Sequence, residues 1–108
     1  MPAQQQTAPE VQTAQPEPRT APLWHVVLLD DDDHTYAYVI EMLGRIFGYS
    51  TEKAYQMACR VDTVGRVVVM TTHKERAELK RDQILAYGAD IRMERSAGSM
   101  SAIIEPAE

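Results

Sequence analysis

The apolar and polar positions of the chain first predict a strand and a helix. Residues 24–29 are largely apolar and end in carboxylates, a pattern typical of a central strand. Beyond the aspartates at 30–33, either His34 or Thr35 is placed to cap a helix that the glycine at position 48 would stop. The inward positions of this helix follow the 3.6-residue period and are Val39, Ile40, Met42, Leu43, Ile46 and Phe47.

The pattern continues with a second helix and a second strand. Ser50 is the expected N-cap, and Glu52 is favourably placed in the first helical turn. The helix is expected to end near Asp62. Its inward residues are Ala54, Met57, Ala58 and Val61. Gly65 then leads into the β-branched run RVVVMT at 66–71, which predicts a strand.

A third helix and a last strand complete the pattern. Thr72 and Glu75 have the spacing of a capping box for a helix that is expected to run through Tyr87 and stop at Gly88. Two short segments, 91–94 and 100–104, compete for the last strand. The order β-α-α-β-α-β predicts a small α+β sandwich, in which a three-stranded antiparallel sheet carries its helices on one face.

The first 22 residues differ in composition from the remainder of the chain. They contain five of the six prolines, no aromatic residue and one isolated valine. This small apolar area cannot offset the entropy that is lost on ordering, so we predict that 1–22 is a disordered extension. A single folded domain, 23–108, is expected to follow it.

Composition and charge exclude several classes of protein. The chain has 108 residues, and its net charge of −5 argues against non-specific nucleic-acid binding. No apolar stretch approaches the roughly 20 residues of a membrane span, and the start of the chain does not resemble a secretion signal. The single cysteine, Cys59, excludes an internal disulfide and a zinc site built on thiolates. We therefore expect a cytoplasmic protein with no membrane or nucleic-acid partner.

The four adjacent aspartates at 30–33 repel one another and require an explanation. A receiver domain would hold magnesium with such acids, but it also needs an aspartate at the end of a later strand, where this chain has hydroxyls. A calcium loop would place its ligands at alternate positions around a glycine, which DDDDHTY lacks. Favourable charge at the start of a helix accounts for one or two of the four. We expect no metal, no other cofactor and no catalytic residues.

The order and spacing of several motifs provide an explanation. The stretch HVVLLDDDDHTYAYVIEMLGRIFGYSTEKA at 25–54, followed by RVVVMT and THKERAELK, resembles the ClpS family of Clp protease adaptors. VVLLDDD matches the family's V-x-L-x-N-D-D turn, IFGY matches its helix end, and EKAYQM matches its E-x-A-x-x-M pattern. The resemblance extends from Trp24 to about Tyr87. It implies a non-enzymatic module that binds N-degrons, the degradation signals formed by the free amino group and the large hydrophobic first residue of a substrate protein.

The resemblance also implies which residues bind. Those implied to surround the substrate α-ammonium are Asp30, Asp31, Asp32 and Asp62. Those implied to line the side-chain pocket are His34, Tyr36, Ala58, Val61 and Met100, with Tyr36 at the family's gating methionine. Glu75 and Lys80 stand where the family docks on the N-terminal domain of the Clp unfoldase. The N-terminal extension would then hand the substrate over.

Two positions depart from the family in the same direction. Asp30 replaces an asparagine and Asp62 replaces a histidine, so both exchanges introduce an acceptor that normally carries charge. Such carboxylates attract an ammonium but repel one another in an empty pocket, which favours a proton on one of them. Ala58 replaces a bulkier methionine, and the preferred first residue stays open. The alternative is a ClpS-like protein that has lost or changed amino-terminus recognition and instead modulates the unfoldase or binds another cationic ligand.

Overall fold

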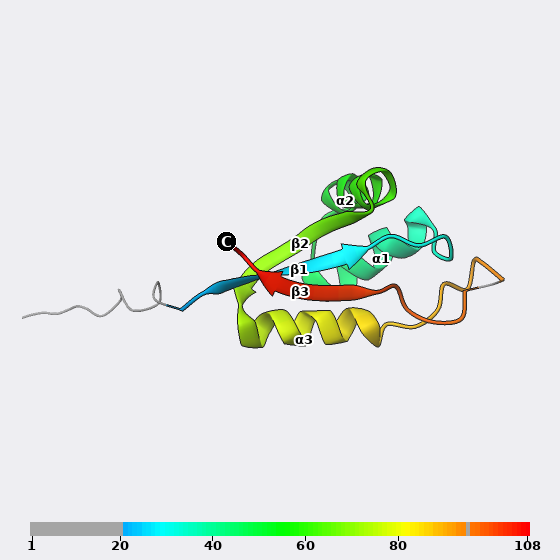
Figure 1. Ribbon diagram of the computed structural model, residues 1–108. Coiled ribbons are helices and arrows are strands. Elements are labelled where there is room, and N and C mark those ends of the chain that lie inside the picture. Colours follow the sequence, from blue (N-terminus) through cyan, green and yellow to red (C-terminus); the bar gives the residue numbers. More distant parts are fainter. Residues whose placement is uncertain (1–20, 95) are drawn as a thin grey trace, which may run out of the picture.

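The computed structural model describes residues 21–94 and 96–108 (Figure 1). In chain order the elements are β1 (Leu23–Leu29), α1 (Tyr36–Phe47), α2 (Thr51–Val64), β2 (Arg66–His73), α3 (Lys74–Leu85) and β3 (Ala102–Pro106). This is the predicted β-α-α-β-α-β order. Residues 1–20 of the predicted disordered extension lie outside the described residues. No helix of the described part is long and apolar enough to cross a membrane.

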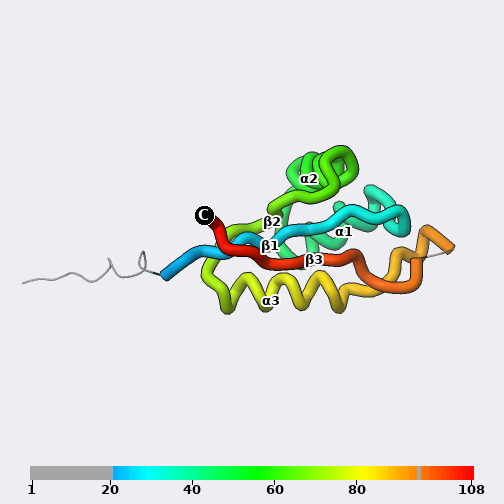
Figure 2. Tube along the Cα trace, viewed as in Figure 1, coloured from blue at the N-terminus to red at the C-terminus, as the bar shows by residue number. Residues whose placement is uncertain are grey.

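The three strands form one antiparallel sheet in the order β2-β1-β3, with β1 at the centre. Val26 pairs with Met70 of β2 and with Ile104 of β3, so the middle of β1 is paired on both edges. Figure 2 shows the last strand of the sequence running beside the first, and the Ala107 backbone N–H donates to the Leu23 carbonyl oxygen at 2.9 Å. The predicted antiparallel sheet is confirmed.

The hydrophobic core lies between the sheet and the three helices. The residues that form it are Val26, Leu28, Tyr38, Val39, Met42, Leu43, Ala54, Ala58, Val61, Val67, Val69, Ala77, Ile84, Met100 and Ala102. On the opposite face of the sheet, Val68 and Ile103 are 37% and 40% exposed. The helices therefore cover one face and leave the other open, as the pattern predicts.

The ends of α1 and α2 follow from local chemistry. Of the two candidate caps for α1, Thr35 is the one used, and its hydroxyl accepts a hydrogen bond from the Tyr38 backbone N–H. Ser50 caps α2 in the same way through the Lys53 N–H. Gly48 ends α1 with a φ of 75°, a left-handed conformation that costs glycine little.

The predicted capping box of the third helix is wrong. β2 continues through the threonine at 72, which pairs with Trp24, and the helix begins only after His73. His73 is the N-cap and makes no side-chain capping bond. Pairing with β1 therefore keeps Thr72 in β2, although the local pattern assigned it to a helix cap. The helix also ends at Leu85 instead of Tyr87.

The last strand occupies only part of one predicted segment. β3 begins at Ala102, two residues later than the predicted 100–104 strand, and it extends to Pro106 opposite Trp24. The competing segment at 91–94 forms turns and no strand. Register against β1 decides this outcome, because β3 pairs over the same residues of β1 that β2 pairs on the other edge.

Candidate functional site

A recess of about 40 Å³ lies where the start of α1 meets the second half of α2. Its lining residues are Asp30, Asp31, His34, Thr35, Tyr36, Val39, Ala58, Val61, Asp62 and Met100. Eight of the nine residues that the sequence analysis assigned to substrate binding are among them. The ninth, Asp32, is exposed and lies outside the lining. The structure thus brings these residues together, whereas their roles stay predictions.

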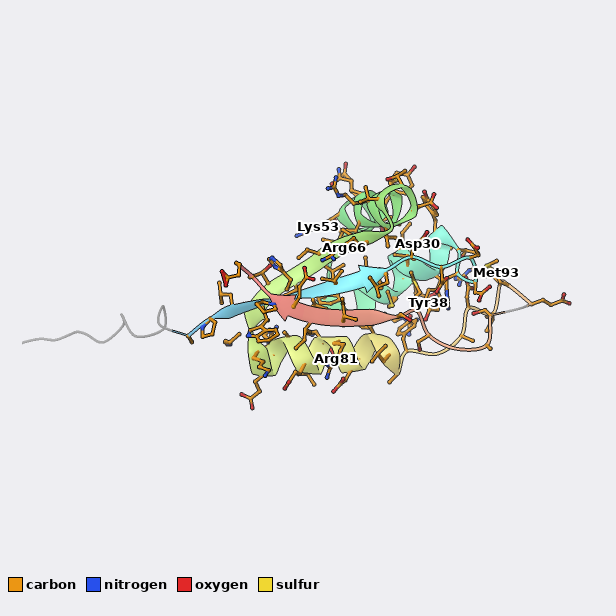
Figure 3. All side chains as sticks on the ribbon, viewed as in Figure 1. Asp30, Tyr38, Lys53, Arg66, Arg81 and Met93 are labelled. Carbon is orange, nitrogen blue, oxygen red and sulfur yellow. The ribbon has the colours of Figure 1, made fainter. Side chains whose placement is uncertain are left out.

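Two backbone hydrogen bonds explain how distant segments meet at the recess. The Asp30 N–H donates to the Gly65 carbonyl oxygen, and the Leu29 N–H donates to the Ser101 carbonyl oxygen, both at 3.0 Å. These bonds hold the end of β1 between the turn after α2 and the chain that enters β3. Figure 3 shows Asp30 just beyond the end of β1. The arrangement therefore brings Asp62 and Met100 towards the aspartate turn.

Asp31 is engaged within its own turn. Its Oδ1 accepts from the Asp33 backbone N–H at 2.9 Å and lies 2.8 Å from Nδ1 of His34. The other ring nitrogen of His34, Nε2, lies 2.7 Å from the Gly98 carbonyl oxygen. His34 thus connects the aspartate turn to the loop that precedes β3, in addition to lining the recess.

Tyr36 and Asp62 close the mouth of the recess. The Tyr36 hydroxyl donates to Asp62 Oδ2 at 2.7 Å, and this bond raises the pKa of Tyr36 above its usual value. The ring centre of Tyr36 also lies 5.9 Å from that of Tyr55. A volume of about 40 Å³ is small beside the cavity of about 150 Å³ that holds one benzene molecule in an engineered protein. A large side chain therefore needs a wider recess than the empty protein provides.

The carboxylate of Asp30 is held at a raised pKa. Although Asp30 is exposed overall, partial desolvation of its carboxyl is the largest cause of the raised pKa, and a hydrogen bond from the Asp31 backbone N–H partly opposes it. Repulsion from Asp62, Asp31 and Asp32 raises the pKa further. The empty site thus favours a proton on Asp30 more than an isolated aspartate would.

The inner wall of the recess is apolar. Ala58, Val61 and Met100 are each at most 2% exposed, and Val39 is 4% exposed. Ala58 and Val61 come from the inward face of α2, as its periodicity predicts, and Met100 comes from the loop before β3. The site therefore combines carboxylates at its mouth with aliphatic side chains behind them.

The two residues assigned to unfoldase docking have different surroundings. Glu75 is exposed in the first turn of α3. Lys80 is half-buried, and its Nζ donates to the Ile46 carbonyl oxygen at 2.8 Å and lies 5.5 Å from the Phe47 ring centre. Lys80 therefore caps the last turn of α1, whatever further contact it makes.

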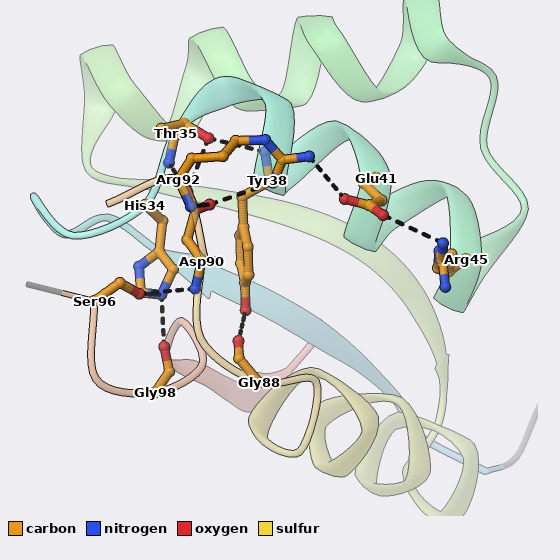
Figure 4. Close-up of polar contacts among 10 residues, drawn as sticks. All are labelled: His34, Thr35, Tyr38, Glu41, Arg45, Gly88, Asp90, Arg92, Ser96 and Gly98. Carbon is orange, nitrogen blue, oxygen red and sulfur yellow. Dashed lines mark hydrogen bonds and ion pairs between the residues drawn. The ribbon is translucent and has the colours of Figure 1, made fainter. Parts of the chain in front are cut away.

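Asp90 is a residue of this region that sequence reasoning missed. It is 1% exposed, and its Oδ2 accepts hydrogen bonds from the backbone N–H and the hydroxyl of Thr35 (Figure 4). The sequence offers only a weak signal: an aspartate shortly after Gly88, with Arg92 two residues on, is typical of a turn. Nothing in it shows that the carboxylate would be buried.

The site shows no arrangement typical of a metal centre. Within 21–94 and 96–108, no group of three or more histidine, cysteine, aspartate or glutamate side chains is placed to hold a metal ion.

Comparison with known proteins places these features in context. Residues 19–93 match the model of the family described as ATP-dependent Clp protease adaptor protein ClpS. The chain is 38% identical over 77 residues to the ATP-dependent Clp protease adapter protein ClpS of Methylococcus capsulatus, covering 71% of this chain and 73% of that relative. It is 31% identical over 80 residues to the ClpS of Alkalilimnicola ehrlichii, covering 74% and 76%.

A solved structure shares the fold. The chain is similar to Agrobacterium tumefaciens ClpS2 bound to L-phenylalaninamide, with a TM-score of 0.69 and 22% sequence identity. The similarity covers 80% of this chain and 98% of that chain.

Proposed function

Because the chain belongs to the ClpS family of adaptors of the ATP-dependent Clp protease, we propose that its recess binds the free amino terminus of a substrate protein. The adaptor then delivers this substrate to the Clp unfoldase for degradation. The observation that carries the proposal is the recess itself, where the carboxylates of Asp30 and Asp62 border an apolar wall that includes Val61 and Met100.

This combination suits the chemistry of a polypeptide's first residue. An α-ammonium carries three donors and one positive charge, so it binds where carboxylate oxygens are exposed at a mouth. The first side chain gains from leaving water for an aliphatic wall. The related Agrobacterium protein was solved with L-phenylalaninamide, which joins a free amino group to an aromatic side chain, and this supports the same ligand class here.

The remainder of the proposal concerns delivery. The chain acts without catalysis, in the cytoplasm, and docks on the N-terminal domain of the unfoldase through the face that carries Glu75. The extension before β1 takes part in the transfer. Membership in a family of Clp protease adaptors supports a role in delivery.

A second candidate function is favoured by the Tyr36–Asp62 hydrogen bond. This bond fills one acceptor that an ammonium would use and leaves only a small recess. A ClpS-like protein with such a closed site would have lost or changed amino-terminus recognition. It would then modulate the unfoldase or bind another cationic ligand.

Fluorescence anisotropy with labelled peptides distinguishes the two functions. We expect peptides that begin with Leu, Phe, Trp or Arg to bind when their amino group is free, with one class of first residue preferred. N-acetylation should abolish the binding because it removes the charge. Binding that ignores acetylation, or no binding by any peptide, would exclude amino-terminus recognition and leave the second candidate.

Matched variants locate the binding in the recess. Asp62→Asn removes one carboxylate of the mouth and should weaken binding of free amino termini. Asp82→Asn is the control, because Asp82 is exposed on α3 beside Arg81 and carries the same charge change away from the recess. Equal effects of the two variants would indicate that net charge, and not the recess, attracts the peptides.

A further inference from the structure

We propose that Asp90 is a positioning residue for the recess: it holds the loop between α3 and β3 against the start of α1 and so fixes the wall that faces a bound side chain. The proposal rests on the proposed function, because it concerns the same site. The loop runs from 86 to 101, and its described residues form no helix or strand. A connection of this length is uncommon in a compact domain unless it serves a function.

The burial of Asp90 is the first observation. Among the described residues, it is the only charged side chain that is buried. A buried carboxylate is costly unless hydrogen bonds satisfy both of its oxygens. Oδ2 accepts from the N–H and the hydroxyl of Thr35 at 2.7 and 2.8 Å. Oδ1 accepts from the N–H and the guanidinium of Arg92 at 3.0 and 3.3 Å.

These bonds overcome the cost of burial. Burial alone would raise the pKa of Asp90, but the donors of Thr35 and Arg92 lower it to about 2. Arg92 is held in turn by Glu41 of α1, whose Oε1 accepts from Nη2 at 3.1 Å (Figure 4). Asp90 is therefore a charged carboxylate at neutral pH, fixed on both sides.

Thr35 passes the position of Asp90 on to α1. Its hydroxyl donates to Asp90 and accepts from the Tyr38 N–H at 3.1 Å, so the three groups form one chain of hydrogen bonds. Because Thr35 is the N-cap, the carboxylate determines where the first turn of the helix lies. Tyr36, which closes the recess, belongs to this turn.

The loop is folded upon Asp90 from its other side. The Asp90 N–H donates to Ser96 Oγ at 2.9 Å, and this oxygen lies 3.3 Å from His34 Nε2. The same His34 nitrogen lies 2.7 Å from the Gly98 carbonyl oxygen, so the ring supports the loop at two points. Figure 4 shows these contacts converging between the loop and the start of α1.

Asp90 reaches the recess only through other residues. It does not line the recess, whereas Thr35, His34 and Met100 do. Met100 follows the supported part of the loop directly and is 2% exposed. Of the carboxylates that line the recess, Asp30 follows the end of β1 and Asp62 lies on α2, so neither belongs to the loop or to the first turn of α1. The proposal therefore predicts that Asp90 affects selectivity for the first side chain and leaves recognition of the amino group intact.

Asp90→Asn tests this role. The NH₂ group of asparagine is itself a donor, so in either orientation of the amide it faces the donors of Thr35 or of Arg92 and cannot accept from them. We expect the variant to bind peptides with the preferred first residue about tenfold more weakly. The difference in affinity between this residue and other first residues should become smaller. The loss on N-acetylation should persist. A purely structural role would weaken every free-amino peptide by the same factor, and that result would overturn the proposal.

Substitution of Thr35 provides an independent test should Asp90→Asn fail to fold. Thr35→Ser keeps the hydroxyl that donates to Asp90 and serves as the conservative partner of a second substitution. Thr35→Val removes the hydroxyl and should reduce the affinity difference between first residues, as Asp90→Asn does. Equal preferences in the two variants would contradict a role for the Asp90–Thr35 contact.

A measurement without peptide separates this proposal from the proposed function. With ¹³C-methyl-labelled methionines, Asp90→Asn should shift or broaden the NMR signal of Met100, which lies near the end of the loop. Met57 and Met70, on α2 and β2, serve as internal controls and should keep their signals. If the wild type bound no peptide, the proposed function would fail, yet this comparison would still decide whether Asp90 fixes the wall. An unmoved Met100 signal would show that it does not.

Discussion

The Tyr36 hydroxyl donates a hydrogen bond to Asp62 Oδ2 at 2.7 Å and so joins the first residue of α1 to the last turn of α2. The resemblance drawn from the sequence predicts that both residues depart from the ClpS pattern, with Tyr36 at a methionine position and Asp62 at a histidine position. The two departures therefore compensate each other in the empty protein. Under the proposed function, an arriving ammonium would compete with the phenol for the same carboxylate.

Removing the phenol hydroxyl should favour the ligand. Tyr36→Phe frees the Asp62 oxygens and keeps the ring, so we expect affinity for a free amino terminus to rise by about threefold. Fluorescence anisotropy with the preferred peptide measures the change. A lower affinity would show that the hydroxyl contacts the ligand instead of excluding it.

Tyr55→Phe is the matched control for this substitution. Tyr55 lies beside Tyr36 at the same mouth and is 51% exposed, but it does not line the recess. The Tyr55→Phe variant should bind the same peptides with the affinity of the wild type. If the two variants gain affinity equally, the cause is a general loosening of side chains around the recess and not the loss of the hydrogen bond to Asp62.

Much of the fold follows from local sequence. The caps Thr35 and Ser50 and the stop at Gly48 depend on short-range chemistry that can be read from the sequence, and the structure confirms them. The second helix, in contrast, continues to Val64, two residues beyond its expected end near Asp62. The family match confirms the resemblance that the aspartate turn and its neighbouring motifs suggested. The order of the motifs indicates the family because it follows the order of the structural elements along the chain.

Contacts between distant residues are the part that sequence could not supply. Thr72 has the local signature of a cap, yet pairing with Trp24 keeps it in the sheet. Asp90 has the signature of an ordinary turn, yet Thr35, 55 positions earlier, makes it a buried anchor. Each outcome depends on a partner that only the fold brings near.

Binding of free amino termini should depend on the protonation of Asp30. The pKa of Asp30 lies above the ordinary 3.8 because of burial and repulsion, and an ammonium prefers the ionised form. Affinity should therefore strengthen as pH rises from acid through this raised pKa and level off near neutrality. Anisotropy across this range measures the profile, and Asp30→Asn should flatten it.

Stability should respond to the same group with the opposite sign. A raised carboxyl pKa means that the folded state holds the proton more tightly than the unfolded state, so ionisation of Asp30 destabilises the fold as pH rises. Asp30→Asn should increase the free energy of unfolding at neutral pH and change it little below pH 3.8. A variant that is less stable at neutral pH would contradict repulsion within the cluster.

Asp90 should contribute stability that disappears in acid. Its folded pKa of about 2 lies below the usual value of 3.8, so the contribution is complete above 3.8 and is lost as pH falls towards 2. Asp90→Asn should cost about 2 kcal/mol at neutral pH, measured by urea unfolding. The difference from the wild type should shrink steadily from pH 4 downwards.

The exposed Asp82 again provides a control for this loss. Its carboxylate accepts from the neighbouring Arg81 at 2.9 Å on the surface of α3. Asp82→Asn should change the free energy of unfolding by less than about 0.5 kcal/mol. A cost for Asp90→Asn that stayed constant from neutral pH to pH 3 would contradict a hydrogen-bonded, ionised carboxylate at this position.

Lys80 and Glu75 should separate in their effects on stability. Lys80 donates to the last turn of α1 through the Ile46 carbonyl oxygen, where a cation also suits the helix dipole. Lys80→Gln should therefore lower the free energy of unfolding by about 1 kcal/mol. Glu75 is exposed, so Glu75→Gln should change it by less than about 0.5 kcal/mol.

The Lys80 and Glu75 variants should rank differently in their effects on unfoldase docking and in their effects on stability. Calorimetric titration with the isolated N-terminal domain of the unfoldase measures both variants at a temperature where each is folded. Glu75→Gln should weaken docking, because the proposed function places this exposed charge on the docking face. Lys80→Arg keeps the cation and separates the two roles of Lys80. If it restored the stability that Lys80→Gln loses but not the docking, Lys80 would contact the partner directly, since a capping role alone would restore both.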